Sequence, residues 1–218
     1  VTAPAVPEIQ ILAKMTGFID PPCQPRDCCV RGNYCYIAGG LGGIIVLDIS
    51  DPVRPEMIAQ KNMDGFVWKI EIYGNILFAA SHDAGFSVFE LTAPADFVLR
   101  SRFDSAGYTI DFAIKGHYAF LADGDNGLAV LDIENLDAPA QVSQRPCGDK
   151  AYDIAISGDF AYVACGLDGL HIYDISNSEA PKLLSRYKSE HVALDVSAKD
   201  GYAYLGDPSA GLITVNVK

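Results

Sequence analysis

GGIIVLDISDPVRP, residues 42–55, is the stretch from which the fold can be predicted, because the chain repeats it. Related segments begin at Ala84 (AGFSVFELTAPADF), Asn126 (NGLAVLDIENLDAP) and Asp168 (DGLHIYDISNSEAP). A shorter segment, AGLITVNVK, begins at Ala210. Self-similarity at a fixed period is the sequence signature of a repeat architecture.

Three sets of positions keep the same interval of 42 residues through five copies. The first set is Gly43, Gly85, Gly127, Gly169 and Gly211. The second, five residues later, is Asp48, Glu90, Asp132, Asp174 and Asn216. The third is Asp27, Lys69, Asp111, Asp153 and Asp195. Agreement at so many positions excludes coincidence and indicates five structural units.

Within a unit the residue pattern is that of β-strands joined by tight turns. In the fourth copy, residues 151–157 (AYDIAIS) and 160–165 (FAYVAC) flank a Gly-Asp pair, which is a hairpin signal. Residues 170–176 (LHIYDIS) follow as a third strand and 181–187 (PKLLSRY) as a more polar fourth one. No window supports a helix longer than a turn or two.

Four antiparallel strands in a unit of this length predict an all-β fold, a five-bladed β-propeller. We expect a single domain over residues 1–218, with blades at approximately 17–63, 64–105, 106–147, 148–189 and 190–218 plus 7–16. The fifth unit lacks a fourth strand, and PEIQILAKMTGF from Pro7 is similar to PEMIAQKNMDGF from Pro55. The N-terminal strand is therefore expected to complete the last blade and close the ring, which removes an exposed sheet edge.

Several segments of the chain resemble the LVIVD repeat of bacterial and archaeal surface or secreted proteins. They are IIVLDISDP, LAVLDI and LHIYDIS, with YDIAISGDFAYVA before the last of them. The resemblance covers essentially the whole chain. It implies a propeller scaffold and an extracytoplasmic setting, and it implies no single activity. The second unit departs most from the pattern, with Lys69 and Glu90 in place of aspartates, so any special role is expected to be concentrated there.

Composition excludes several classes of function. The chain has 28 Asp and Glu against 16 Lys and Arg, a net charge of −12. This field repels nucleic acid and anionic membranes, and no apolar run approaches the roughly 18 residues of a transmembrane segment.

Three of the six cysteines lie close together, from Cys23 to Cys29, which favours an oxidising compartment. A removed signal peptide would explain the start at Val1, as would a trimmed chain, and we expect a secreted, periplasmic or cell-surface protein.

The acidic ring is a candidate metal site. Asp27, Asp111, Asp153 and Asp195 fall near the start of each innermost strand, where converging carboxylates would suit a hard cation such as calcium. The alternative is that each accepts hydrogen bonds from backbone N–H groups and locks blade to blade. Lys69 favours this alternative, because its ammonium offsets charge without a metal. Apart from this possible calcium ion, we expect no cofactor.

Four of the cysteines belong to the first blade. Cys23 lies in an insertion before the first strand, Cys28 and Cys29 lie on that strand, and Cys35 lies on the hairpin partner, on the same face as Cys28. A disulfide from Cys23 to Cys28 or Cys29 would pin the insertion over the channel mouth. A vicinal Cys28–Cys29 bridge is possible but strained.

The other two cysteines belong to the fourth blade. Cys147 lies in a loop equivalent to that of Cys23, so the two could approach each other across the mouth, and Cys165 is expected to be a small buried hydrophobe. The cysteine spacings match neither a conventional zinc site nor a haem attachment motif. Disulfides are therefore favoured over metal, but the pairing cannot be read from the sequence.

Side chains that break the repeat at one end of the blades are candidates for ligand or partner binding. We expect them on the loops around the channel mouth. They are Trp68, Lys69, His82, Asp83, Asp125, Arg145, Asp168 and His191. Polar loop residues are common without a function, and that interpretation stands beside the functional one.

The expected function is a non-catalytic binding scaffold that recognises a protein partner or an extracellular ligand, alone or within a larger assembly. No nucleophile elbow, phosphate loop or paired metal-ligand motif supports chemistry. The alternative is a glycosidase-like hydrolase or a metal-dependent enzyme in the channel mouth. A hydrolase would need two carboxylates roughly 5–10 Å apart in different roles, and the equivalence of the acidic ring argues against such a pair.

Overall fold

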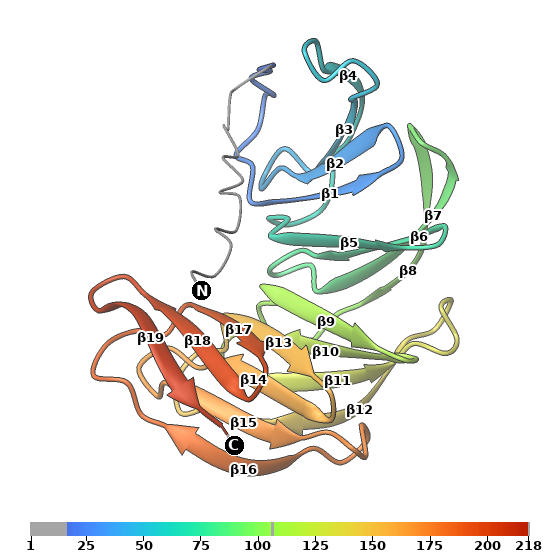
Figure 1. Ribbon diagram of the computed structural model, residues 1–218. Helices are drawn as coiled ribbons and strands as arrows, with labels where there is room; N and C mark the ends of the chain where they lie inside the picture. Colours follow the sequence, from blue (N-terminus) through green and yellow to red (C-terminus); the bar gives the residue numbers. More distant parts are fainter. Residues whose placement is uncertain (1–16, 106, 218) are drawn as a thin grey trace, which may run out of the picture.

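The computed structural model describes residues 17–105 and 107–217, which form five antiparallel sheets (Figure 1). The first sheet contains β1 (Asp27–Arg31), β2 (Tyr34–Ala38), β3 (Ile44–Asp48) and β4 (Glu56–Lys61). The second contains β5 (Lys69–Tyr73), β6 (Ile76–Ala80), β7 (Phe86–Ala93) and β8 (Asp96–Phe103). The third contains β9 (Asp111–Lys115), β10 (Tyr118–Ala122), β11 (Leu128–Asp132) and β12 (Ala140–Arg145).

The fourth sheet contains β13 (Asp153–Ser157), β14 (Phe160–Ala164), β15 (Leu170–Asp174) and β16 (Lys182–Tyr187). The fifth has three strands, β17 (Asp195–Lys199), β18 (Tyr202–Asp207) and β19 (Gly211–Asn216). Strands that are consecutive in the chain are neighbours in each sheet, and the sheets follow one another in chain order along an arc (Figure 1). The prediction of an all-β, propeller-like fold is confirmed.

The core consists of layers between consecutive sheets. Between the third and fourth sheets, Phe120, Leu128 and Val130 pack against Ile154 and Val163. The equivalent faces form the other layers, so each inner sheet is covered on both sides. This explains why the third strand of a unit reads as a nearly continuous apolar run rather than as an alternation.

Pairs of backbone hydrogen bonds also join consecutive sheets. They connect Gly40 with Val67, His82 with Thr109, Gly124 with Ala151, and Gly166 with Ala193. The next pair in the series would be Pro208 with Pro25, and neither residue has an N–H to donate. The structure of residues 17–105 and 107–217 contains no such bridge between the fifth and first sheets.

Closure of the ring stays a prediction, because the expected closing strand, residues 7–16, lies outside the described residues. The exposure of Leu212 on β19 indicates where we expect another part of the chain to cover the fifth sheet. Its equivalents Ile44, Phe86, Leu128 and Leu170 are all fully buried, whereas Leu212 is 71% exposed.

The repeated glycine at the start of each third strand has two structural reasons. Its φ is positive, between 72° and 79° in the first four copies, a conformation that costs other residues free energy. A Cβ there would also collide with the carbonyl oxygen of the last residue of the fourth strand, for example Tyr187 at Gly169. At Gly211, φ is 80° but a Cβ would meet nothing within 4 Å.

Alanine substitutions of three glycines test ring closure. Gly158→Ala, at a positive φ with free space, is expected to destabilise by about 1 kcal/mol. Gly169→Ala adds a collision between the new Cβ and the carbonyl oxygen of Tyr187, and is expected to lower the free energy of unfolding by about 2–4 kcal/mol. If a fourth strand covers the fifth sheet, Gly211→Ala will match Gly169→Ala in urea unfolding. A cost like that of Gly158→Ala would contradict closure.

Candidate functional site

A cavity of about 630 Å³ opens where the innermost strands of the five sheets begin. Most of its lining comes from two adjacent positions of the repeat. The acidic ring, defined as Asp27, Lys69, Asp111, Asp153 and Asp195, lies on the first residues of the innermost strands β1, β5, β9, β13 and β17. The variable ring, one residue earlier, consists of Arg26, Trp68, Ile110, Tyr152 and Leu194.

Three carboxylates of the acidic ring lock each blade to the next. Asp27 accepts a hydrogen bond from the N–H of Ile70 at 3.1 Å. Asp111 accepts one from Ile154 at 3.1 Å, and Asp153 one from Val196 at 2.6 Å. Each acceptor lies 43 residues before its donor, so these bonds repeat with the blades.

Lys69 breaks this series, because an ammonium cannot accept a hydrogen bond. Its Nζ instead lies 3.0 Å from Oδ1 of Asp111. Burial by itself disfavours the charged ammonium, but the Asp111 carboxylate more than offsets this and raises the pKa of Lys69 above its ordinary value. The second and third blades are therefore joined here by an ion pair rather than by a carboxylate–amide bond.

Asp153 is the acid of this ring whose pKa differs most from its ordinary value. Burial raises the pKa of this carboxyl well above its usual range, and hydrogen bonding to Asp111, the charge of Asp111 and a hydrogen bond to Asp195 raise it further. These effects all favour the protonated form of Asp153 at neutral pH. Equivalent positions of the acidic ring therefore differ in charge, with an ammonium at Lys69 and a carboxyl at Asp153 whose neutral form is favoured.

The possible calcium site has no geometric support. In the part of the chain that the structure describes, no three carboxylates of the acidic ring offer oxygens within 4.8 Å of one another. A proton held by Asp153 also makes the ring a poorer set of ligands for a hard cation, which prefers ionised oxygens. The calcium ion stays a prediction.

Aromatic and cationic side chains are paired at the rim of the cavity. The Arg26 guanidinium lies 4.8 Å from the ring centroid of Trp68 and 4.9 Å from that of Phe66. Lys150 Nζ lies 5.6 Å from the ring of Tyr108. The ring of His82 stacks on the same Tyr108 ring, with 4.4 Å between the two ring centroids. These contacts hold the rim side chains in place before any ligand arrives.

Of the eight residues predicted for the channel mouth, Trp68, Lys69 and His82 line the cavity. Asp83 lies beside it, 3.7 Å from the His82 ring, and Asp125 lies 3.7 Å from Lys150.

The other three predicted residues lie away from the cavity lining. Arg145 ends the outermost strand β12 and donates to the carbonyl of Pro181. Asp168 lies beside the fourth-blade cysteines and pairs with His171. His191 donates its backbone N–H to Ser189 in the loop before β17.

Six side chains that line the cavity were not predicted from the sequence: Arg26, Tyr108, Ile110, Lys150, Tyr152 and Leu194. Four of them share the period of the acidic ring, shifted by one residue. That shift was the available signal, but the residue types differ from blade to blade, so no shared letter drew attention to them.

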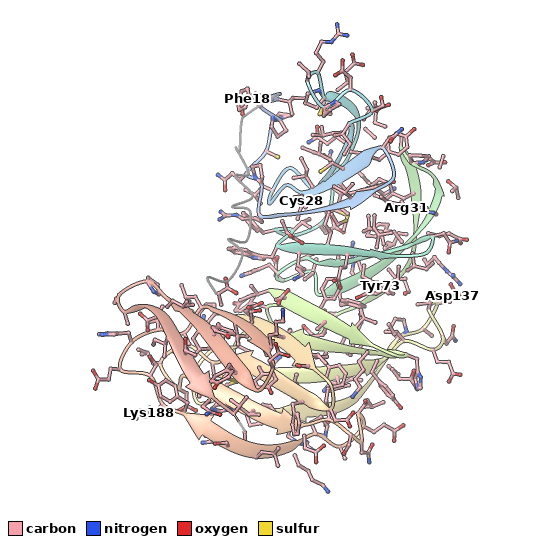
Figure 2. The ribbon with its side chains drawn as sticks, in the orientation of Figure 1. Phe18, Cys28, Arg31, Tyr73, Asp137 and Lys188 are labelled. Atoms are coloured by element: carbon pink, nitrogen blue, oxygen red, sulfur yellow. A yellow bond between two sulfur atoms is a disulfide. The ribbon has the colours of Figure 1, made fainter. Side chains whose placement is uncertain are left out.

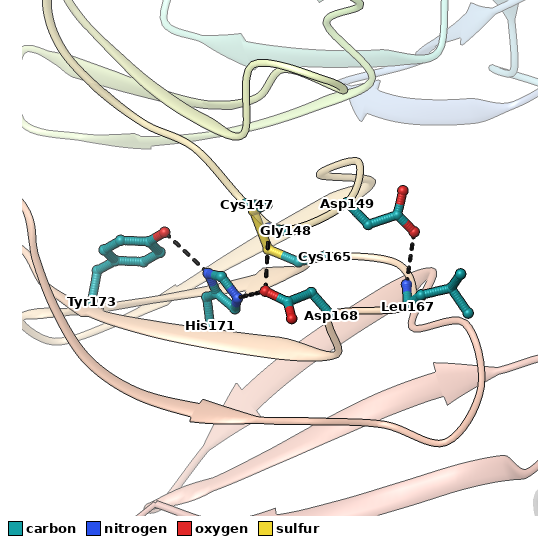
Figure 3. Close-up of a disulfide and its surroundings, with 8 residues drawn as sticks. All are labelled: Cys147, Gly148, Asp149, Cys165, Leu167, Asp168, His171 and Tyr173. Atoms are coloured by element: carbon teal, nitrogen blue, oxygen red, sulfur yellow. Dashed lines mark hydrogen bonds and ion pairs between the residues drawn. A yellow bond between two sulfur atoms is a disulfide. The ribbon is translucent and has the colours of Figure 1, made fainter.

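The structure corrects the predicted cysteine pairing. A disulfide joins Cys147 to Cys165, so the expectation that Cys165 serves only as a packed hydrophobe was wrong (Figure 3). Cys147 follows β12 and its Cα lies 5.9 Å from that of Cys165 at the end of β14, within disulfide range. Cys147 is therefore not bonded to Cys23, the pairing across the mouth that the sequence left open.

The four cysteines of the first blade are free thiols. Cys23 packs against Gly39 and Gly42 rather than against Cys28 or Cys29, so neither predicted bridge to the insertion forms. Cys28, labelled on β1 in Figure 2, is exposed and hydrogen-bonds through sulfur to Cys35, which confirms that these two share a face. Burial and nearby acids raise the pKa of Cys29 to about 12, which keeps this thiol protonated and unreactive.

The disulfide occupies a position where other blades use a hydrogen bond. At the equivalent residues of the third blade, Ser105 donates to Asp123 at 2.6 Å, and in the fifth, Ser189 donates to Asp207 at 3.3 Å. In each case the link ties the loop after one sheet's last strand to the end of a middle strand. The Cys147–Cys165 bond is therefore the covalent form of a strap that the repeat uses elsewhere.

Comparison with known proteins agrees with this repeated geometry. The model of the LVIVD repeat matches residues 24–62, 106–144, 148–189 and 192–217, more than half of the chain. The chain belongs to the LVIVD repeat family. The second blade of this LVIVD-repeat protein lies outside the matched stretches, and it is the blade that carries Lys69 and Glu90.

Two computationally designed proteins have similar crystal structures. Ika4 superposes with a TM-score of 0.61 at 11% sequence identity, over 72% of this chain and 95% of its own. Ika8 superposes with a TM-score of 0.57 at 11% identity, over 87% of this chain and 70% of its own. At this identity the likeness shows the fold alone. No sequence of a curated protein matches the chain.

Asp153→Asn tests the protonation of Asp153. Because the folded pKa is raised above the ordinary 3.8, the native state binds a proton that the unfolded state releases, so stability falls as pH rises from about 4 through neutrality. The asparagine keeps the hydrogen bonds of the protonated acid and removes this loss, which amounts to at most about 1.4 kcal/mol per pH unit. Urea unfolding between pH 4.5 and 8 measures it.

The control is Asp83→Asn, which makes the same substitution at an exposed position beside the cavity. Its stability should follow that of the wild type across the pH range. Parallel curves for Asp153→Asn and the wild type would show that the proton is not held at Asp153.

Proposed function

We propose that this LVIVD-repeat protein is a non-catalytic binding module that acts outside the cytoplasm and recognises a protein partner or an extracellular ligand at its central cavity. The observation that carries the proposal is the variable ring. One repeat position holds five different residue types, and all five side chains line the same cavity. A position that served only the blades would favour one residue type, as the repeated glycine does.

The chemistry of the cavity suits a polar ligand that presents a flat face. Trp68, Tyr108 and Tyr152 offer aromatic surfaces, while Arg26 and Lys150 offer cations above the acidic ring. Aromatic side chains give a large contact area for little loss of conformational entropy. The cavity volume is within the usual range for small-ligand sites, so a peptide segment or the end of an oligosaccharide fits it better than a broad protein surface.

Two observations support a location outside the cytoplasm and a partner that is not nucleic acid. The Cys147–Cys165 disulfide is of a kind that persists in oxidising compartments. The net charge of −12 disfavours nucleic acid and anionic lipid surfaces. Among the described residues, no helix combines the length and the apolar character needed to cross a membrane.

One observation favours a second candidate function, a hydrolase. Asp153 holds a proton beside Asp111, and a protonated acid next to a second carboxyl is the arrangement that acid–base hydrolysis uses. The symmetry argument against a differentiated pair is weakened, because Lys69 contacts Asp111 alone. Both acids nevertheless hold neighbouring blades together through backbone hydrogen bonds, which accounts for them without catalysis.

Binding at the cavity can be followed through Trp68, the single tryptophan of the chain. The immobilised protein is used to capture partners from the culture medium and envelope extract of its source, and each is then titrated while tryptophan emission is recorded. We expect Tyr152→Ala to weaken binding at least about fivefold, since a buried aromatic contact contributes about 1 kcal/mol or more.

Tyr73→Ala is the matched control, because Tyr73 ends β5 away from the cavity lining and its side chain is partly exposed (Figure 2). It should bind as the wild type does. A partner that binds Tyr152→Ala and the wild type equally would place recognition elsewhere on the molecule and contradict the proposal.

Hydrolysis is tested with a panel of aryl glycosides between pH 4 and 8. A binding module gives no turnover above buffer. If turnover is found, and Asp153→Asn abolishes it while remaining folded by circular dichroism, the hydrolase replaces the binding module as the function of this cavity.

A further inference from the structure

The fourth blade contains a second cluster of reactive groups, away from the cavity lining. The sulfurs of Cys147 and Cys165 and a ring nitrogen of His171 all lie within 4.8 Å of one another. His171 projects from β15 toward the cysteines, and its side chain is fully buried (Figure 3). Two thiols and an imidazole are ligands that zinc and other thiophilic divalent ions prefer.

The packing of the blades does not require these side chains. At the position of His171, the other blades carry Ile45, Ser87, Ala129 and Ile213. At the positions of the two cysteines, the third and fifth blades carry the Ser–Asp straps described above. The fourth blade thus replaces three residues at once, and the three replacements converge on one point. Blade stability alone gives no reason for a buried imidazole there.

The surroundings of His171 are those of a held metal ligand. Its Nε2 lies 2.7 Å from Oδ2 of Asp168, and its Nδ1 lies 3.2 Å from the hydroxyl of Tyr173. A carboxylate on a histidine nitrogen fixes the orientation of the ring, as it does around many bound metals. Asp168 in turn accepts the N–H of Gly148, the residue after Cys147, so carboxylate, ring and thiol are positioned together.

An ion could reach the cluster from solvent. Cys147 is half-buried and the Asp168 side chain is 24% exposed, whereas Cys165 and His171 form the closed inner side. In a tetrahedral zinc site, ligand atoms lie roughly 3.5–4 Å apart, given bond lengths of about 2.0–2.3 Å. The three ligand atoms already lie within 4.8 Å of one another. Once the two sulfurs are no longer bonded, they must separate to this spacing, and the ring nitrogen that binds the ion must give up its present hydrogen bond to Asp168 or Tyr173.

We propose that, when the Cys147–Cys165 disulfide is reduced, the two thiolates and the His171 imidazole bind a zinc ion or another thiophilic divalent cation. A dithiol reductant supplies the two electrons and two protons that convert the disulfide into two thiols, and is itself oxidised to a disulfide. Metal binding then releases both thiol protons to solvent. A water molecule or an external ligand takes the fourth position.

The test uses a variant in which the free thiols Cys23, Cys28, Cys29 and Cys35 are all serine, so that Cys147 and Cys165 are the remaining cysteines. Native mass spectrometry records zinc uptake before and after reduction, and competition with a chromophoric chelator gives the affinity. We expect one zinc ion on the reduced protein, with the loss of two protons. We expect none on the oxidised protein.

Two substitutions that restore the residues of other blades provide matched controls. His171→Ile inserts the residue of the first and fifth blades, and is expected to weaken zinc binding more than about 100-fold, since even outer partners of a ligand contribute 10–100-fold. Cys147→Ser with Cys165→Asp recreates the strap of the third and fifth blades and should bind no zinc. The proposal is overturned if the reduced four-serine protein takes up no more zinc than this double variant. It is also overturned if His171→Ile leaves zinc uptake unchanged.

If the four-serine variant does not fold, cobalt replaces zinc in the wild-type chain. A thiolate-to-cobalt charge-transfer band that appears on reduction and is lost in both restored variants supports the site. A band of the same intensity in all three proteins comes from the first-blade thiols and refutes it.

Discussion

Each inner sheet of this protein is apolar on both faces, and it is therefore stable only between two neighbours. Burial of Ile44, Phe86, Leu128 and Leu170 depends on the next sheet as much as on their own. Consecutive blades must consequently be aligned closely, and the carboxylates of Asp27, Asp111 and Asp153 achieve this by accepting N–H groups from the next innermost strand. Because these strands converge, the alignment device and the cavity are built from the same residues.

Two features make the repeated positions of the acidic ring unequal. Lys69 cannot accept an N–H, so it pairs with Asp111. Burial and the neighbouring acid Asp111 separately favour the protonated form of Asp153. Sites that are equivalent in the sequence repeat are thereby different in charge. The variable ring above them adds a further level of asymmetry, with Arg26, Trp68 and Tyr152 at one repeat position.

The period of 42 residues was sufficient to predict the sheets and the acidic ring, because each of these depends on a residue type that recurs. The variable ring was missed for the opposite reason, since Arg26 and Tyr152 share a position but no chemistry. The Cys147–Cys165 pair was also missed, although comparing Ser105 and Asp123 with them would have indicated a link. Arg145 was misplaced because its strand position, at the outer edge, depends on three-dimensional packing.

The two prolines at the junction of the last and first blades have a mechanical consequence. Elsewhere, parting two blades breaks a pair of backbone hydrogen bonds, such as those between Gly124 and Ala151. Pro208 and Pro25 cannot form that pair, so a ring closed at this point would lack these two backbone hydrogen bonds at one of its junctions. A closed ring of blades with one weaker junction is expected to open first at that junction under thermal motion. Opening of this kind would widen the cavity on the side where the last and first sheets meet.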